Sequence, residues 1–232
     1  LISNYSYLNS LIEYEKENED SMFNINFEIF EDLSKKDSDA YEYVYPNYNY
    51  EKNLFSSYNG DLLFNSSGYQ KKYDTNKYEG IVINDLRYNS MLKVKQNGIT
   101  NNFSLLIKNI NFDGDKSDDF GSETNQKFLS ALNYNLGFPL LKKVGNNEKY
   151  LTPKLSARFS PTETKNIIND DNRIDYIDLF DENRVNRNDM VEGGESLTLG
   201  FDYSVKNENK KDLINFSAGQ VFRKNGNSDL PR

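Results

Sequence analysis

The strongest constraint on the fold is an alternation of apolar and polar residues with a period of two. In residues 196–205, apolar side chains occupy every odd position, and polar or small residues occupy every even position. Successive side chains of a β-strand point to opposite faces of a sheet, so this period predicts strands with one apolar face. Segments 151–160, 22–29 and 128–138 repeat the pattern. Weaker versions predict strands over residues 5–16, 41–51, 61–70, 79–95, 102–113 and 212–223.

The predicted strands are long for a soluble sheet. About ten are predicted, most of about 9 to 14 residues, whereas strands of soluble proteins have about 5–6 residues. A tilted strand that crosses a bilayer needs about 9–11 residues. The lengths therefore favour a transmembrane β-barrel, whose strands are apolar only on the face toward lipid.

The predicted connections alternate in length along the chain. Short polar turns are expected at 17–21, 97–101 and 207–211. Longer connections are expected at 33–40, 71–78, 114–125 and 161–194. Such alternation is typical of an up-and-down barrel with short periplasmic turns and long outer loops. Two connections, 52–60 and 138–148, are longer than this pattern predicts.

The composition agrees with strands that are apolar on one face. Hydrophobic residues make up 36% of the chain and the mean hydropathy is −0.82, and no run approaches the ~20 apolar residues of a transmembrane helix. Disorder would explain the polarity, but disordered chains are poor in aromatic residues, and this chain has 17 Tyr and 15 Phe. We therefore predict an all-β fold, part of a large antiparallel up-and-down transmembrane β-barrel that is incomplete in this chain.

We expect residues 1–232 to form a single domain that is cut at both ends. The chain begins at Leu1 without the basic and apolar regions of a signal peptide, and it ends at Arg232 in a segment that suggests the middle of a loop. The longest connection, about 161–194, is expected to be an outer loop, because a structureless segment of this length is uncommon in a compact soluble domain.

The composition also excludes several classes of activity. The chain has no Cys and no His, which excludes a thiol nucleophile and a Ser-His-Asp triad and leaves no soft-metal site. The net charge of −8 argues against a nucleic-acid partner, which needs a basic surface. We predict no catalytic residue, no cofactor site and no metal site, and we expect that the protein is not an enzyme.

Two further segments each have two interpretations. The acidic segment 170–184 could bind Ca²⁺ through carboxylate oxygens, or it could be a solvated loop with a short helix, which its apolar residues at helical spacing favour. The Tyr-rich run 41–50 could form an aromatic girdle at the membrane boundary, or a ladder of cross-strand pairs in a soluble sheet. Pro46 within this run predicts a kink or bulge.

The two clearest strands assign their residues to opposite faces of the predicted barrel wall. The candidates for the lumen face are Lys154, Ser156, Arg158, Thr198 and Asp202. The candidates for the lipid face are Leu155, Phe159, Leu197, Leu199, Phe201 and Tyr203. The charges of Lys154 and Arg158 could meet an anionic ligand in the lumen, or they could be satisfied by other polar groups there.

Several motifs in the second half of the chain resemble those of one family. Residues 138–141 (FPLL) and 150–161 (YLTPKLSARFSP) are similar to a strand with the pattern PL…L-x-P-[KR]-x-x…P. Residues 178–184 (DLFDENR) and 189–195 (DMVEGGE) resemble a long loop with the pattern N-x-F…N-R…G-x-D-x-x-E-x-G. Residues 216–223 (FSAGQVFR) match a strand that ends G-Q-x-[FY]-R. Together they resemble the barrel of the lipopolysaccharide-assembly family LptD.

The motifs cover roughly the last ninety residues, and segment 61–90 resembles the family less specifically. One departure is Arg187-Asn188-Asp189, where the family has a Gly before the Asp. This departure leaves the shape of the local turn open.

The resemblance implies that the protein carries lipopolysaccharide to the outer leaflet of the outer membrane. It also implies partners: lipopolysaccharide, outer-membrane lipids, an LptE-like plug lipoprotein, and a periplasmic LptA-like bridge that would meet an N-terminal domain outside this chain. A polar lumen would let a polyanionic head pass while the acyl chains leave sideways. The alternatives are another outer-membrane barrel, such as a porin or nutrient receptor, and a soluble all-β binding module.

Overall fold

The computed structural model describes residues 6–117, 120, 124–169, 174–226 and 229–230. The strands are β1 (Tyr7–Glu17), β2 (Ser21–Asp32), β3 (Tyr41–Ser57), β4 (Gly60–Tyr73), β5 (Lys77–Ser90), β6 (Lys93–Val94), β7 (Thr100–Asp115), β8 (Asn125–Gly137), β9 (Leu140–Val144), β10 (Asn147–Ser160), β11 (Gly194–Lys206) and β12 (Asp212–Arg223). The helices are two short 3₁₀ turns, η1 (Asp37–Ala40) and η2 (Tyr176–Phe180).

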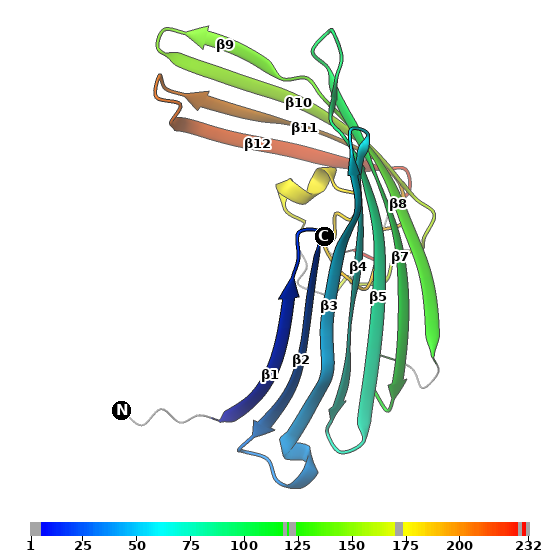
Figure 1. The fold of residues 1–232 in the computed structure, drawn as a ribbon. Helices are drawn as coiled ribbons and strands as arrows, with labels where there is room; N and C mark the ends of the chain where they lie inside the picture. The colour runs from blue at the N-terminus through cyan, green and yellow to red at the C-terminus, as the bar shows by residue number, and fades with distance from the viewer. Residues whose placement is uncertain (1–5, 118–119, 121–123, 170–173, 227–228, 231–232) are drawn as a thin grey trace. The chain divides into compact units, whose positions relative to one another are not determined.

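All twelve strands belong to one antiparallel sheet (Figure 1). The path runs β1-β2-β3-β4-β5-β7-β8-β10-β11-β12, so each strand pairs with its neighbours along the chain. The short strands β6 and β9 lie off this path and pair with β7 and β10. The path ends at β1 and β12, and the sheet is not closed. The prediction of an all-β, up-and-down fold that is an incomplete barrel is confirmed.

The structure explains the two connections that did not fit the alternation in length. β3 extends to Ser57 and β4 begins at Gly60, so the connection 52–60 reduces to a two-residue turn. The connection 138–148 contains β9, which folds back as a hairpin on the first residues of β10. Each of these two connections therefore contains a tight turn, as an up-and-down barrel has between neighbouring strands.

Two predicted boundaries are wrong. The connection 71–78 was expected to be long, but only three residues separate β4 from β5, and all three, Asp74, Thr75 and Asn76, have positive φ. This left-handed turn joins the two strands directly, so β4 continues to Tyr73 and β5 begins at Lys77. The segment 79–95, predicted as one strand, is divided into β5 and β6 by a break at residues 91–92.

The bulge predicted at Pro46 is present in β3. Asn26 of β2 pairs with Asn47, but Glu28 pairs with Val44, so β3 contains one extra residue beside Pro46. In β7, by contrast, burial alternates without interruption from Ser104 to Ile110. In 102–113 the apolar residues change from odd positions (Phe103, Leu105, Ile107) to even positions (Ile110, Phe112), a change that a bulge would explain. The burial pattern instead places Ile110 on the covered face and shows no bulge there.

The chain divides into two compact units. The first comprises Leu1–Ser56, Leu62–Leu86 and Lys108–Phe128, and the second comprises Ser57–Asp61, Arg87–Ile107 and Leu129–Arg232. The expectation of a single domain stays a prediction. The second unit contains β8 from Leu129 onward, β9 to β12 and most of the motif-bearing residues, and the candidate site lies within it.

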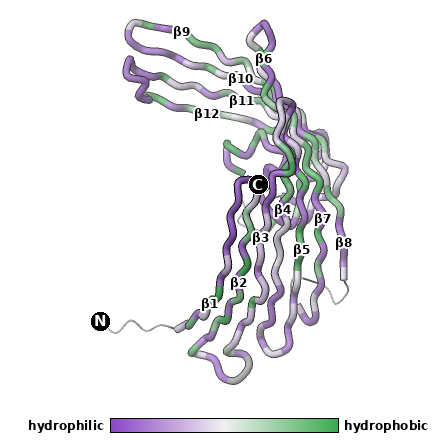
Figure 2. The backbone as a smooth tube through the Cα atoms, viewed as in Figure 1, coloured by the Kyte–Doolittle hydropathy of each residue, from purple (hydrophilic) through white to green (hydrophobic). Residues whose placement is uncertain are grey.

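Polar and apolar residues occur together along the strands, as Figure 2 shows. Many large apolar side chains are exposed, among them Phe159, Leu199 and Phe222. A single-layered sheet exposes its apolar face in this way unless lipid or another layer covers it. No helix among the described residues is long and apolar enough to span a membrane.

Candidate functional site

The register of β10 and β11 separates the predicted site residues into two sets. Ser156 pairs with Thr198 and Leu155 pairs with Leu199, so polar pairs and apolar pairs alternate along the two strands. Ser156, Arg158 and Thr198 are at most 4% exposed. The five polar candidates, Lys154, Ser156, Arg158, Thr198 and Asp202, share one face, and the six apolar candidates, Leu155, Phe159, Leu197, Leu199, Phe201 and Tyr203, share the other.

The polar face is buried because the long connection between β10 and β11 returns over it. We call residues 174–193 of this connection the return segment. It begins before η2, drawn in yellow in Figure 1, and ends at β11. The short helix predicted in the acidic segment is thus present as η2, whereas residues 170–173, which belong to the possible ion site, lie outside the described residues.

A pair of glycines makes room for η2 on the polar face. Gly200 of β11 pairs directly with Gly219 of β12. A Cβ atom at Gly200 would lie 2.8 Å from Cζ of Phe180, and a Cβ atom at Gly219 would lie 2.8 Å from Cδ1 of Leu179. Larger residues at these positions would push η2 away from the sheet, so the two glycines let the helix approach the strands closely.

A buried ion-pair cluster holds the far end of the return segment. Glu192 accepts hydrogen bonds from Arg184 within the segment, Nε to Oε2 at 3.1 Å, and from Arg223 of β12, Nε to Oε1 at 2.7 Å. Arg158 of β10 donates from Nε to the carbonyl oxygen of Glu182 at 2.6 Å and from Nη2 to the carbonyl oxygen of Glu192 at 2.5 Å. The side chains of Arg184 and Glu192 are each 1% exposed.

Glu182 forms a second connection between the return segment and the strands. Its carboxylate accepts a hydrogen bond from Ser104 Oγ at 2.9 Å and lies 2.8 Å from Nε of Arg87. Phe180 contributes its carbonyl oxygen, which accepts a hydrogen bond from Asn133 Nδ2 at 2.5 Å. Residues of β5, β7, β8, β10, β11 and β12 therefore all contact the same short segment.

Lys154 and Asp202 lie at the η2 end of the site. Their side chains form an ion pair at 2.5 Å, and Tyr176 donates its hydroxyl to Asp202 at 2.7 Å. The Lys154 ammonium also lies 5.3 Å from the ring centroid of Phe180, within the range of a cation–π contact. Lys154 and Asp202 are thus satisfied by each other and by η2.

Apolar contacts add to the polar ones. Val191 is fully buried against Leu106 of β7 and Ala131 of β8. Met190 belongs to a separate buried cluster with Ile167, Val185 and Leu230. Burying a side chain of this size contributes roughly 1.5–3 kcal/mol, so the segment is held by both apolar packing and charge.

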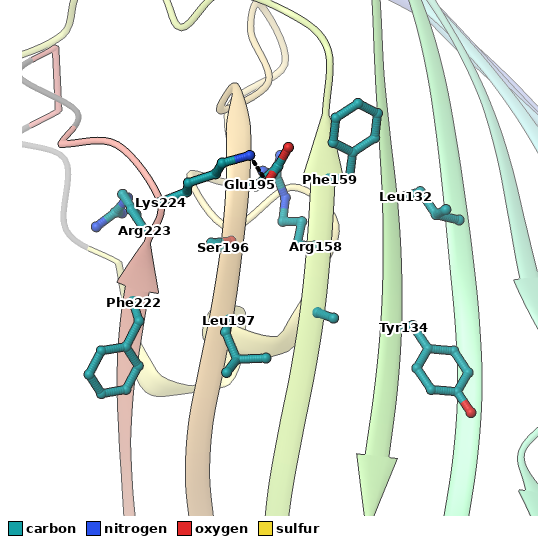
Figure 3. A pocket seen from close by; sticks show the side chains of 11 residues that line it. Leu132, Tyr134, Arg158, Phe159, Glu195, Ser196, Leu197, Phe222, Arg223 and Lys224 are labelled. Atoms are coloured by element: carbon teal, nitrogen blue, oxygen red, sulfur yellow. Dashed lines mark hydrogen bonds and ion pairs between the residues drawn. The ribbon is translucent and has the colours of Figure 1, made fainter.

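The opposite face of the same strands carries a shallow groove of about 630 Å³ (Figure 3). Leu132, Phe159, Leu197 and Phe222 line it, and the ion pair between Lys224 and Glu195, at 2.7 Å, closes one end. The two faces of this part of the sheet are therefore chemically distinct: one is apolar and open, and the other is charged and covered.

The electrostatics of the return segment follow from this arrangement. Burial raises the pKa of Glu192, but Arg184 and Arg223 outweigh it, so the pKa lies below its ordinary value. Asp189 is also partly buried, which raises its pKa, but hydrogen bonds from Arg187 and Lys165 lower it to about 2. Both carboxylates therefore stay charged at neutral pH.

A family model confirms what the motifs suggested. The model described as LPS transport system D, LptD, matches residues 2–231, which is nearly the whole chain. The chain belongs to the LptD family. This is a family of outer-membrane proteins that transport lipopolysaccharide to the outer membrane. No curated protein matches the chain in a sequence comparison.

Within the LptD motifs, the structure shows what several residues do. Arg184, Glu192 and Arg223 were quoted in the resemblance without a role, and they form the buried cluster. The departure at 187–189 is accommodated by an Arg187–Asp189 ion pair, with Nε to Oδ1 at 2.8 Å.

Sequence reasoning missed the cluster because its contacting residues are up to 34 positions apart along the chain, as Arg158 and Glu192 are. The signal that could have found it is an Arg near the end of each of two predicted strands, 151–160 and 212–223, that flank the strand 196–205.

Proposed function

We propose that the chain forms part of the wall of the lipopolysaccharide translocon of the outer membrane. Its polar face would line the lumen through which the glycolipid head passes, and its apolar face would contact outer-membrane lipids. The observation that carries the proposal is the division of the central parts of β10 and β11 into an apolar, largely exposed face and a polar, charged face. In a transmembrane barrel these two faces meet lipid and the lumen.

The remaining roles of the LptD family are part of the same proposal. The protein would act together with an LptE-like plug lipoprotein, and a periplasmic LptA-like bridge would deliver the substrate. Moving an amphipathic glycolipid requires a path with one polar and one apolar side, and it requires no bond to be made or broken. We therefore propose a transporter rather than an enzyme.

Site-specific photocrosslinking in cells tests the assignment of the faces. A photoreactive residue at Thr152, on the polar face of β10, should crosslink to lipopolysaccharide during its transport. The same photoreactive residue at Leu199, on the apolar face, should crosslink mainly to the acyl chains of membrane lipids. If depletion of the full-length protein left lipopolysaccharide transport intact, the translocon assignment would be wrong, and a porin or nutrient receptor would explain the barrel.

A further inference from the structure

Among the described residues, two arginines of the sheet donate side-chain hydrogen bonds only to oxygen atoms of the return segment. Arg158 of β10 and Arg223 of β12 lie on the polar face, and we call them the wall arginines. Arg158 donates only to the main-chain carbonyls of Glu182 and Glu192, and Arg223 pairs with the Glu192 carboxylate. Among the described residues, no carboxylate from any strand pairs with either guanidinium group.

Positive charge is in excess at this place. Four guanidinium groups lie near two carboxylates: Glu192 pairs with Arg184 and Arg223, Glu182 pairs with Arg87, and Arg158 donates to main-chain oxygens beside both. Arg158 is 4% exposed, and its Nη1 atom has no hydrogen-bond acceptor within the described part of the chain. A buried donor without an acceptor costs about 1–3 kcal/mol, and more for a charged group. The wall arginines therefore have unused capacity for an anion.

The return segment is built so that it can leave the wall. At one end, η2 packs on the small Gly219 of β12, where the side chains of Leu179 and Tyr176 come close to the strand. At the other end, Gly194 has a φ of +92°, a conformation that glycine adopts without strain. A glycine at the joint with β11 lets the backbone rotate there while the strand keeps its register.

We propose that the return segment is a built-in substitute for a phosphate-bearing ligand and that it leaves the wall arginines when such a ligand arrives. The segment offers one carboxylate and two neutral carbonyl oxygens, whereas a phosphate group offers up to two negative charges and several acceptor oxygens. The planar guanidinium group binds phosphate oxygens in pairs, which a single carbonyl cannot match. The ligand therefore gains more from the wall arginines than the segment does.

The identity of the ligand rests on the proposed function: it is the phosphorylated head of the transported lipopolysaccharide. The return segment would then keep the path closed when no substrate is present, and the substrate would open it by competing for the same arginines. The competition requires a differential affinity for the two states, which the charge excess supplies.

A single cysteine beneath the segment reports whether the segment has left the wall. Thr198 is 1% exposed and donates its hydroxyl to the carbonyl oxygen of Leu179. Residues 1–232 include no cysteine, so Thr198→Cys in the full-length protein can be labelled with a water-soluble maleimide with little background from this region. Ser204→Cys, on the same face of β11, is the matched control because the contacts of the return segment described above do not include it.

Purified lipopolysaccharide should raise the labelling rate of the Thr198→Cys protein by about tenfold, which corresponds to about 1.4 kcal/mol. It should leave the Ser204→Cys control within about twofold. Enzymatically dephosphorylated lipopolysaccharide should have little effect. Inorganic phosphate at millimolar concentration distinguishes the source of the ligand: release by phosphate alone would support the anion site and assign it to the free ion.

A variant that loosens the segment without touching the arginines provides a second test. Gly219→Val would place its side chain where Leu179 and Tyr176 pack, so labelling of the cysteine should rise without ligand. Gln220→Val, the next residue on the opposite face of β12, should have no effect. Should Thr198→Cys fail to fold, hydrogen exchange of residues 176–192 in otherwise unmodified protein gives the same readout.

The proposal is overturned if lipopolysaccharide leaves both the labelling rate and the exchange of residues 176–192 unchanged while it still crosslinks at Thr152. In that case the substrate passes with the segment in place, and the proposed function survives. If lipopolysaccharide crosslinks nowhere on the polar face, the proposed function itself fails.

Discussion

Replacing Glu192 with Gln should loosen the return segment far more than it perturbs the sheet. The Glu192 side chain is 1% exposed and lies between Arg184 and Arg223. Glutamine has nearly the same shape and keeps one acceptor oxygen, but it removes the only carboxylate that contacts these two guanidinium groups among the described residues. The variant therefore changes charge at a fixed volume.

The size of the effect follows from burial. Removing one partner of a fully buried ion pair costs about 3–5 kcal/mol, because it leaves a buried charge uncompensated. Arg184 is 1% exposed, so the full cost applies to it. Arg223 is 29% exposed and recovers part of its hydration. We expect the state in which the return segment covers the polar face to lose about 3 kcal/mol of stability, which raises the equilibrium constant for local opening by about 150-fold.

Hydrogen exchange measured by mass spectrometry on the full-length protein in detergent tests this number. Amides of residues 176–192 should exchange about two orders of magnitude faster in Glu192→Gln than in the wild type, while amides in the middle of β10 and β11 should keep their rates. The control is Glu195→Gln, because the Glu195–Lys224 pair is at least half exposed. An exposed pair contributes only about 0–1 kcal/mol, so this variant should resemble the wild type.

Two outcomes would refute the reasoning. Exchange in Glu192→Gln within about threefold of the wild type would mean that the buried carboxylate does not hold the segment. Equal acceleration in Glu192→Gln and Glu195→Gln would mean that general loss of charge, and not the buried cluster, controls it.

Three further predictions concern the segment and the apolar face. Asp189 has a folded pKa of about 2 against an ordinary value of 3.8, so its stabilisation is present above pH 3.8 and is lost as the pH falls through 2. Asp189→Asn should speed local exchange at pH 7 by roughly tenfold, after a discount for partial exposure, and the ratio to the wild type should shrink below pH 4. Tyr176→Phe removes the hydrogen bond to Asp202 and should cost about 1 kcal/mol, measured as a roughly fivefold faster exchange of η2. Leu199→Arg, on the apolar face, should cost up to about 2–4 kcal/mol if this face meets lipid, seen as less heat-modifiable folded protein in membranes, whereas Ser204→Arg on the polar face should be tolerated.

Most strands could be predicted from the sequence because their pattern is local. Alternation in 151–160 and 196–205 predicted both the strands and the division of their residues between two faces. The structure places the ends of these strands within two residues of the prediction, except that β10 begins four residues earlier. The errors lie where turn chemistry overrides composition. The polar residues 71–78 suggested a long connection, but three consecutive left-handed residues, Asp74 to Asn76, close a tight turn there.

Along the chain, the period of two determined strands with one apolar and one polar face, because the face of each side chain depends only on its own position in its strand. What covers the polar face was decided by the tertiary structure alone. Arg158 donates a hydrogen bond to the carbonyl of Glu192, 34 residues further along the chain. Gly200 and Gly219 make room for η2 only because β11 and β12 pair in the observed register. Contacts of this kind depend on how a long connection returns, and no local pattern of residues encodes that path.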